Sequence, residues 1–284
     1  MTTSTTNERD LEADIVTDFR QRMSYGSYLQ LDTLLSAQVP VTNPVHHDEM
    51  LFIIQHQTSE LWLKLMIHEL RSARALIAAD DLQPALKRIA RVKHIQKQLT
   101  EQWSVLATLT PSEYGEFRGE LGNASGFQSA QYRAVEFLLG NKNARMLSVF
   151  DADPDNRAML EDLLNEPSVY DEFLRFLARA GYSVPSEVLE RDVTKGYVMN
   201  EQLIDTFRTI YNDPAEHWLA YETCEEFVDL EDNFQLWRFR HLKTVARIIG
   251  NKRGTGGSSG TAFLQKALDL TFFPELFAVR TEIG

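Results

Sequence analysis

The sequence predicts an all-α protein, a helical bundle with a small appended helical part. Three observations support this fold class. Apolar residues recur at three- and four-residue spacing along most of the chain, as on the buried face of a helix. Alternation of β-branched residues with a period of two is nearly absent. Helix start and stop signals border the periodic segments.

Two long amphipathic helices are expected first, over residues 46–79 and 86–109, since each carries one continuous apolar stripe. Thr110, Pro111 and Glu113 then form a helix start, with a Thr N-cap, Pro at the first helical position and Glu closing a capping box.

Two further helices are expected to end at Gly-Asn pairs, over residues 126–139 and 214–249. Between them the pattern is broken by prolines, which indicates a small helical subdomain over about 150–211 with helices near 155–165, 168–180 and 201–211. We expect residues 1–20 to form a flexible N-terminal segment and residues 21–284 to form one helical domain.

Composition narrows the function. The 284 residues are 43% hydrophobic and 25% charged, as in a globular protein with a sizeable core. The net charge of -12 disfavours nucleic-acid binding, which uses an excess of Lys and Arg. A single cysteine, Cys224, makes no internal disulfide and no cysteine metal cluster. Neither a targeting signal nor a membrane-spanning run is evident, so a cytoplasmic protein without membrane contact is expected.

The histidines carry the chemical signal. None of the seven follows a Glu by three residues, and no two lie three or four residues apart, so a metal site made only of protein ligands is disfavoured. A haem needs only one axial histidine. His241 lies in the middle of an apolar helix face and is the best candidate, although a core histidine bonded to a carbonyl would fit the same pattern. Arg238, Arg240 and Arg247 suit haem propionates or a solvated face equally.

Other candidates have equally plain structural alternatives. His56 shares a helix face with Phe52 and could be purely structural. Tyr114 and Arg118 lie four residues apart, where the Arg fork could bind a carboxylate or simply cover a core tyrosine. Ser125 has the pattern of a helix cap. The glycine-rich loop 254–260 lacks the Lys of a nucleotide-binding loop, but it permits close approach to a ligand, with Thr255 at its entry.

Several long motifs together resemble the bacterial tryptophan 2,3-dioxygenases, from about residue 20 to the C-terminus. The resemblance rests on segments 25–29 (YGSYL), 46–62 (HHDEMLFIIQHQTSELW), 109–114 (LTPSEY), 125–129 (SGFQS), 234–241 (FQLWRFRH) and 252–260 (KRGTGGSSG). It implies a helical domain that encloses a b-type haem, active as Fe2+. The enzyme would insert both atoms of O2 across the indole C2–C3 bond of L-tryptophan, giving N-formyl-L-kynurenine in the first step of the kynurenine pathway.

The resemblance also implies roles for particular residues. His241 would be the proximal haem ligand, with Trp103 near the haem and Ser125 and Gly126 in the distal pocket. His56 would contact the indole N–H, Arg118 with Tyr114 would hold the substrate carboxylate, and Thr255 would contact the ammonium and carboxylate. The remaining substrate contacts would come from Phe52, Ile53, Ile54 and Gln55, and from Tyr25, Tyr28 and Leu29 of a neighbouring subunit in a homotetramer.

Two other functions stay open at this point. The chain could be a haem-binding sensor or carrier without turnover, although the full set of substrate contacts argues against that. It could also be a cofactor-free helical interaction protein, for which an acidic surface and long helices would suffice.

Overall fold

A computed structural model describes residues 7–8, 11–20 and 22–283. These residues form helices, turns and loops with no strand, which confirms the all-α fold class. The chain divides into two units, residues 1–40 and 41–284. Residues 1–6 and 9–10 of the predicted N-terminal segment lie outside the described residues, as do Gln21 and Gly284. The described helices include none with the length and hydrophobicity needed to cross a membrane.

The first unit contains two short helices, α1 (Tyr25–Leu29) and α2 (Leu31–Leu34). Ser24 caps α1 by accepting a hydrogen bond from the Ser27 backbone N–H at 3.1 Å. Gln30, with a φ of 52°, lies in the left-handed region and separates the two helices.

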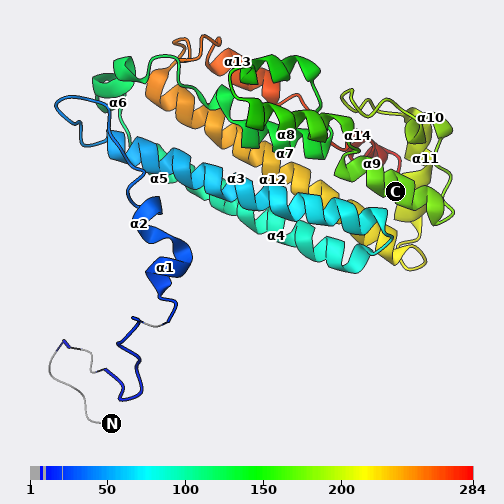
Figure 1. Ribbon diagram of the computed structural model, residues 1–284. Coiled ribbons are helices and arrows are strands. Elements are labelled where there is room, and N and C mark those ends of the chain that lie inside the picture. Colours follow the sequence, from blue (N-terminus) through cyan, green and yellow to red (C-terminus); the bar gives the residue numbers. More distant parts are fainter. Residues whose placement is uncertain (1–6, 9–10, 21, 284) are drawn as a thin grey trace. The chain divides into compact units, whose positions relative to one another are not determined.

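The second unit is a bundle in which the three longest helices, α3, α4 and α12, run side by side (Figure 1). Its helices are α3 (Glu49–Ala78), α4 (Leu82–Glu101), α5 (Trp103–Leu106), α6 (Pro111–Arg118), α7 (Ala130–Leu139), α8 (Pro154–Asn165), α9 (Val169–Arg179), α10 (Ser186–Leu189), α11 (Glu201–Asn212), α12 (Trp218–Ile249), α13 (Thr261–Ala267) and α14 (Pro274–Ala278), with 3₁₀ turns η1 (Gly119–Leu121), η2 (Gly126–Gln128), η3 (Ala144–Phe150) and η4 (Val279–Thr281).

Local signals set most helix ends where the sequence predicts them. The Thr110 capping box opens α6, with both of its reciprocal hydrogen bonds present. Gly140 ends α7 at a φ of 107°, a conformation that glycine adopts without strain. Gly250 likewise ends α12 at a φ of 61°.

Three predicted helices differ in detail from the observed ones. The segment 86–109 is two helices, because the chain leaves α4 after Glu101 and α5 begins at Trp103. The segment 126–139 is also divided, since Ser129 adopts an extended conformation and caps α7 by accepting from the Tyr132 N–H. The last long helix begins at Trp218 because residues 214–217 form a turn.

The core of the bundle lies where α3, α4, α7, α9 and α12 meet. Its largest fully buried side chains are aromatic and include Phe117, Phe137, Phe173, Phe227 and Phe234. Buried aromatic rings remove large apolar areas from water and dominate the energetics of such a core.

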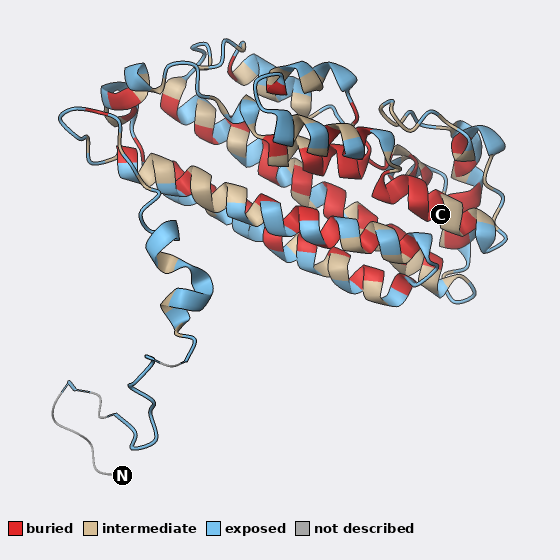
Figure 2. Cartoon of the chain, viewed as in Figure 1, coloured by how far each residue is buried: buried red, intermediate tan, exposed pale blue. Residues whose placement is uncertain are grey.

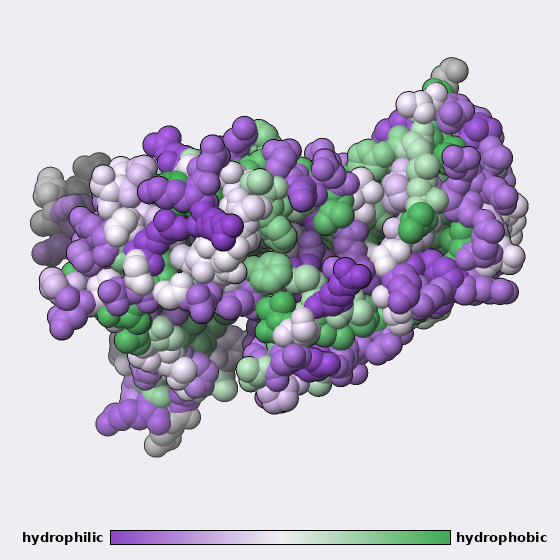
Figure 3. All heavy atoms as spheres, turned by 90° about the horizontal axis from the view of Figure 1, so that it is seen from above, coloured by the Kyte–Doolittle hydropathy of each residue, from purple (hydrophilic) through white to green (hydrophobic). Residues whose placement is uncertain are grey.

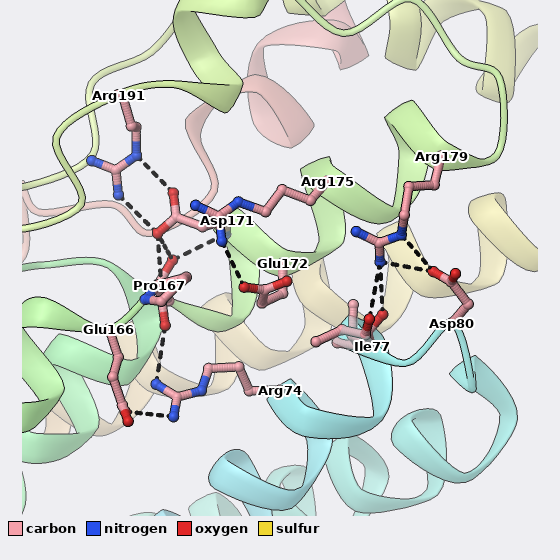
Figure 4. Close-up of polar contacts among 12 residues, drawn as sticks. Arg74, Ile77, Asp80, Glu166, Pro167, Asp171, Glu172, Arg175, Arg179 and Arg191 are labelled. Carbon is pink, nitrogen blue, oxygen red and sulfur yellow. Dashed lines mark hydrogen bonds and ion pairs between the residues drawn. The ribbon is translucent and has the colours of Figure 1, made fainter.

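Ion pairs connect the two ends of α9 to α3 and to the residue pair that follows α3 (Figure 4). Before α9, the Arg74 side chain of α3 pairs with Glu166 and donates to the Pro167 carbonyl at 3.1 Å. At the other end, Arg179 pairs with Asp80 at 2.7 Å. These contacts hold α9, which belongs to the proline-interrupted region of about 150–211, against α3 of the main bundle.

Burial is uneven along α3. Its C-terminal half supplies core residues at regular spacing, whereas residues 50–62 are only half-buried or exposed, with Gln55 as the exception (Figure 2). The inward face of α3 near its N-terminal end is therefore incompletely packed by the chain itself.

The burial of charged side chains in the bundle can be tested at one ion pair. Glu136 of α7 and Arg238 of α12 are both buried and pair at 2.9 Å. Glu136→Ala leaves the Arg238 charge without this partner, so the free energy of unfolding should fall by about 3–5 kcal/mol. Glu161→Ala, which removes the exposed Arg157–Glu161 pair, should cost about 1 kcal/mol or less. Urea denaturation measures the free energy of unfolding of both variants. An equal loss in the two would contradict the burial of the Glu136–Arg238 pair.

Candidate active site

Two histidines from different helices define the centre of the site. His56 lies on α3 and His241 on α12. Among the described residues both helices pack along α4, whereas they hardly contact one another. A charge on His56 would act on His241, so the two rings lie within electrostatic reach of each other.

The hydrogen bond of His56 fixes its tautomer. Its Nδ1 lies 2.7 Å from the carbonyl oxygen of Phe52, one turn earlier on α3. A carbonyl only accepts hydrogen bonds, so Nδ1 carries the proton and Nε2 keeps a lone pair. Burial lowers the pKa of His56, with the bond to Phe52 and the charge of Glu60 opposing the shift. His56 is therefore a neutral ring that presents an acceptor.

His241 lies in an aromatic setting. Its ring stacks on Trp103 at 4.7 Å between centroids and 11° between planes, and Trp237 lies 6.4 Å away. Burial, followed by the charge of His56, lowers the pKa of His241 to about 4. Within the described residues, no hydrogen bond engages its ring nitrogens, and the residue keeps some solvent accessibility. A neutral imidazole with an open nitrogen is a suitable axial metal ligand.

Two unpartnered buried donors lie beside His241, and a third lies next to His56 in sequence. The indole Nε1 atoms of Trp103 and Trp237, whose rings contact His241, are buried and lack hydrogen-bond partners among the described residues, as does the Nε2 atom of Gln55 on α3. Buried N–H groups normally have an acceptor, so these atoms mark places where a further group would accept. A flat apolar cofactor with acidic substituents fits the half-buried helix faces, the open histidine nitrogen and these donors together.

Aromatic side chains form one wall beside His56. The Phe52 ring lies 4.2 Å from the His56 ring, 5.8 Å from Tyr114 and 5.5 Å from Phe117. The last two belong to α6, which the Thr110 capping box positions. Such a wall can contact the face of an aromatic substrate.

Arg118 connects this wall to the glycine-rich loop. Its Nη2 donates to the Arg253 carbonyl at 2.6 Å. Burial raises the pKa of Tyr114, while the charge and hydrogen bond of Arg118 oppose the shift. Thr255 donates to the Ala124 carbonyl, and a Cβ at Gly256 would lie 2.7 Å from the Ser125 Cβ. Only glycine permits this close approach of the loop to Ser125.

The other predicted site residues of the second unit lie at the 3₁₀ turn η2 and along α3. Ser125 caps η2 through a complete capping box, with Gly126 as its next residue. On α3, Ile53 is half-buried and Gln55 is buried, while Ile54 is 47% exposed.

Three of the predicted substrate contacts belong to the first unit, residues 1–40. Tyr25 and Tyr28 are 76% and 71% exposed, and Leu29 is 39% exposed.

Two partners of the histidines were not predicted as site residues. Trp237 lies one turn before His241, and Glu60 lies one turn after His56, where the Gln131 Nε2 donates to both its carbonyl and its carboxylate. Four-residue spacing from each histidine was the signal that could have identified Trp237 and Glu60.

The fold and the site define a helical protein in which two neutral histidines from different helices lie within electrostatic reach of each other, near an aromatic wall and a polar loop. The comparisons agree. The family model for tryptophan 2,3-dioxygenase matches residues 12–208 and 205–283. The tryptophan 2,3-dioxygenases of Arthrobacter sp. (strain FB24) and Kineococcus radiotolerans are 70% and 69% identical, over 98% and 99% of both chains. That of Serratia proteamaculans is 62% identical over 98% of this chain and 99% of its own. The chain belongs to the tryptophan 2,3-dioxygenase family.

The low pKa of His241 makes stability depend on pH. The unfolded chain binds the proton near pH 6.5 and the folded chain only near pH 4, so acid favours unfolding between these values. The contribution is complete above pH 6.5 and disappears as the pH falls toward 4. The ligand-free wild type should therefore lose about 2 kcal/mol more over this range than His241→Leu does. Urea denaturation across pH measures this loss. His94→Leu, at an exposed position, should behave as wild type, and parallel curves for all three proteins would contradict the burial of His241.

Proposed function

We propose that the protein is a haem-dependent dioxygenase that adds both atoms of O2 across the indole C2–C3 bond of L-tryptophan. The product is N-formyl-L-kynurenine, in the first step of tryptophan degradation. The observation that carries the proposal is the pair of neutral histidines, His56 and His241, within electrostatic reach of each other. Arg118, bonded to the glycine-rich loop, follows the aromatic residues that lie beside His56. The names of the close relatives support the reaction.

The cofactor in this proposal is haem b, held by His241. The open nitrogen of His241 would ligate the iron, and the Trp103 ring stacked on His241 would keep the imidazole in place. The unpartnered Nε1 of Trp103 can donate to an acidic substituent of the cofactor. Ferrous haem supplies the oxygen chemistry when bound, while the protein binds and orients the substrate and excludes water.

The polar end of tryptophan would bind at Arg118. A guanidinium fork holds a carboxylate through two parallel hydrogen bonds. Arg118 now donates to the Arg253 carbonyl, so the substrate carboxylate would take over a donor that already points toward the loop. Tyr114 would lie beside the carboxylate, and Thr255 would contact the ammonium group. These contacts favour a free amino acid over indole alone.

The indole ring would lie against the aromatic wall. Phe52 contributes a ring face, and the neighbouring Ile53, Ile54 and Gln55 of α3, with Ser125 and Gly126, would complete the pocket. The Nε2 lone pair of His56 would accept from the indole N–H. Because an indole N–H is a very weak acid and burial keeps His56 neutral, we assign His56 to orienting the substrate rather than removing its proton.

The quaternary arrangement in this proposal is a homotetramer. Tyr25, Tyr28 and Leu29 would enter the pocket of a neighbouring subunit. Their exposure within the first unit supports this role, since large apolar side chains on a short helix are stabilised by burial against a partner. The division at residue 20 and the cytoplasmic location stay predictions of the sequence.

Haem ligation and turnover are tested together in one preparation. Haem-loaded wild type should show a Soret band that shifts on anaerobic addition of tryptophan to the reduced protein, and should form N-formylkynurenine when O2 is admitted. His241→Ala should lose the Soret band. His94→Ala is the matched control and should keep it. A Soret band without product would identify a haem sensor or carrier, and no band in the wild type would exclude the haem enzyme altogether.

The substrate anchor is tested by Arg118→Ala. A charged anchor is worth roughly 2–5 kcal/mol when its partner stays in the site, so the KM for tryptophan should rise far more than tenfold. Arg118→Lys should recover part of the loss, since it keeps the charge without the fork. Arg145→Ala, at an exposed position on η3, serves as the control. Steady-state kinetics at saturating O2 measure these effects, and a KM within twofold of wild type would remove Arg118 from the site.

A further inference from the structure

The charge of the chain is distributed unevenly. Residues 233–268 contain seven of the 29 Lys and Arg residues and not one Asp or Glu. The rest of the chain holds the other 22 basic residues and all 41 acidic ones. The C-terminal half of α12, the glycine-rich loop and α13 thus form a basic segment in an otherwise strongly acidic protein.

Three exposed residues of this segment lie on one face of α12. Arg240, Lys243 and Arg247 are spaced three and four residues apart, so their side chains share a face. We call this set the basic stripe. Within the described part of the chain, none of the three forms an ion pair, and neither do Lys87 and Lys97 of α4, so what distinguishes the stripe is the clustering of three such charges without an acidic residue between them.

The basic stripe lies behind His241 on the same helix. Each residue advances about 100° around an α-helix, so Lys243, two residues after His241, points about 160° away from it. Trp237 and His241 face the interior, while Lys243 faces solvent. A helix with its side chains is about 10–12 Å across, which sets the separation between the stripe and the histidine ring.

Exposed apolar residues adjoin the basic stripe. Leu236 and Phe239 are 49% and 45% exposed, and the Lys243 Nζ lies 5.2 Å from the centre of the Phe239 ring. With Leu268, Asp232 and Gln235, these two residues line a hollow of about 410 Å³. Figure 3 shows that apolar patches lie among hydrophilic residues on the face of the molecule seen from above. An apolar centre beside a charged rim is the usual composition of a protein docking surface.

We propose that the basic stripe and the adjoining Leu236 and Phe239 dock an acidic one-electron carrier protein, which reduces ferric haem held by His241. The inference rests on the proposed function, because that reaction requires ferrous iron. One electron leaves the reduced carrier and converts ferric iron to ferrous iron; no bond forms or breaks and no proton moves. A carrier on the outer face of α12 lies one helix thickness from the axial ligand.

The length and the positive charge of the basic stripe favour a compact acidic protein as its binding partner. From Arg240 to Arg247 the stripe extends about 10 Å along the helix, given a rise of about 1.5 Å per residue. An extended polyanion would run beyond the stripe onto the acidic remainder of the protein, where it is repelled. A small acidic surface patch matches the stripe in both size and sign, as in weak electron-transfer complexes.

The test measures reduction of the haem rather than turnover. Ferric protein is mixed anaerobically with reduced plant-type [2Fe–2S] ferredoxin, an acidic one-electron carrier, and the Soret change is followed by stopped flow. Reduction of the wild type should slow about tenfold or more from low to high salt. At low salt, Lys243→Glu/Arg247→Glu should slow it by at least about tenfold. Lys87→Glu/Lys97→Glu, the same charge change at exposed positions of α4, should stay within about twofold of wild type.

Two further measurements separate the possible outcomes. Dithionite should reduce all three proteins at one rate, because a small reductant does not need the docking surface. Oxidised ferredoxin should bind the haem-free wild type and not the Lys243→Glu/Arg247→Glu variant, so the stripe is tested even if haem uptake fails and the proposed function is wrong. Equal reduction rates in the two variants, or a salt-independent rate in wild type, would overturn the proposal. So would sedimentation showing that the stripe variant alters oligomeric state while ferredoxin reduction is unchanged, because the occupant would then be a second copy.

Discussion

The packing of α3 and α12 on α4 is the constraint on which the rest of the structure depends. Both helices lie along α4 and hardly contact each other in the described residues, so α4 sets the distance between them. The C-terminal half of α3 fills this arrangement with core side chains, while its N-terminal half leaves the inward face half-buried. His56 and His241 project from the two helices that α4 holds apart. A change that shifted either helix on α4 would change the spacing of the histidines.

Burial gives the two histidines different chemistry from one physical cause. It disfavours the protonated form of both rings. The Phe52 carbonyl then accepts a hydrogen bond from Nδ1–H of His56, which leaves Nε2 as an acceptor. Among the residues that the structure describes, His241 has no such hydrogen bond, and its ring stacks on Trp103. One histidine therefore presents an acceptor and the other an unbonded ring nitrogen, which in the proposed function would serve the substrate and the haem iron respectively.

Charged side chains inside the bundle have partners, whereas those on the outer face of α12 do not form ion pairs within the described residues. Buried charged groups have ionic or hydrogen-bonding partners: Glu136 pairs with Arg238 and Asp171 with Arg191, while Glu275 accepts hydrogen bonds from two tyrosines. On the surface of α12 the opposite holds, since Arg240, Lys243 and Arg247 form no ion pair within the described residues. Unpaired exposed charges add little to stability, so the clustering of like charges on one short face is better explained by recognition than by folding.

The sequence by itself determined the helices and their local ends. The three- and four-residue periodicity identified α3 and α12, and the Thr110 capping box and Gly140 act through residues within one turn of themselves. The breaks at Gln102 and Ser129 were missed because the apolar periodicity continues across them. Only the tertiary structure decided that Trp103 stacks on His241 and that Arg118 donates to the Arg253 carbonyl. These partners are more than 130 residues apart in sequence, and no local pattern encodes their contact, because it follows from how α5, α6 and α12 pack together.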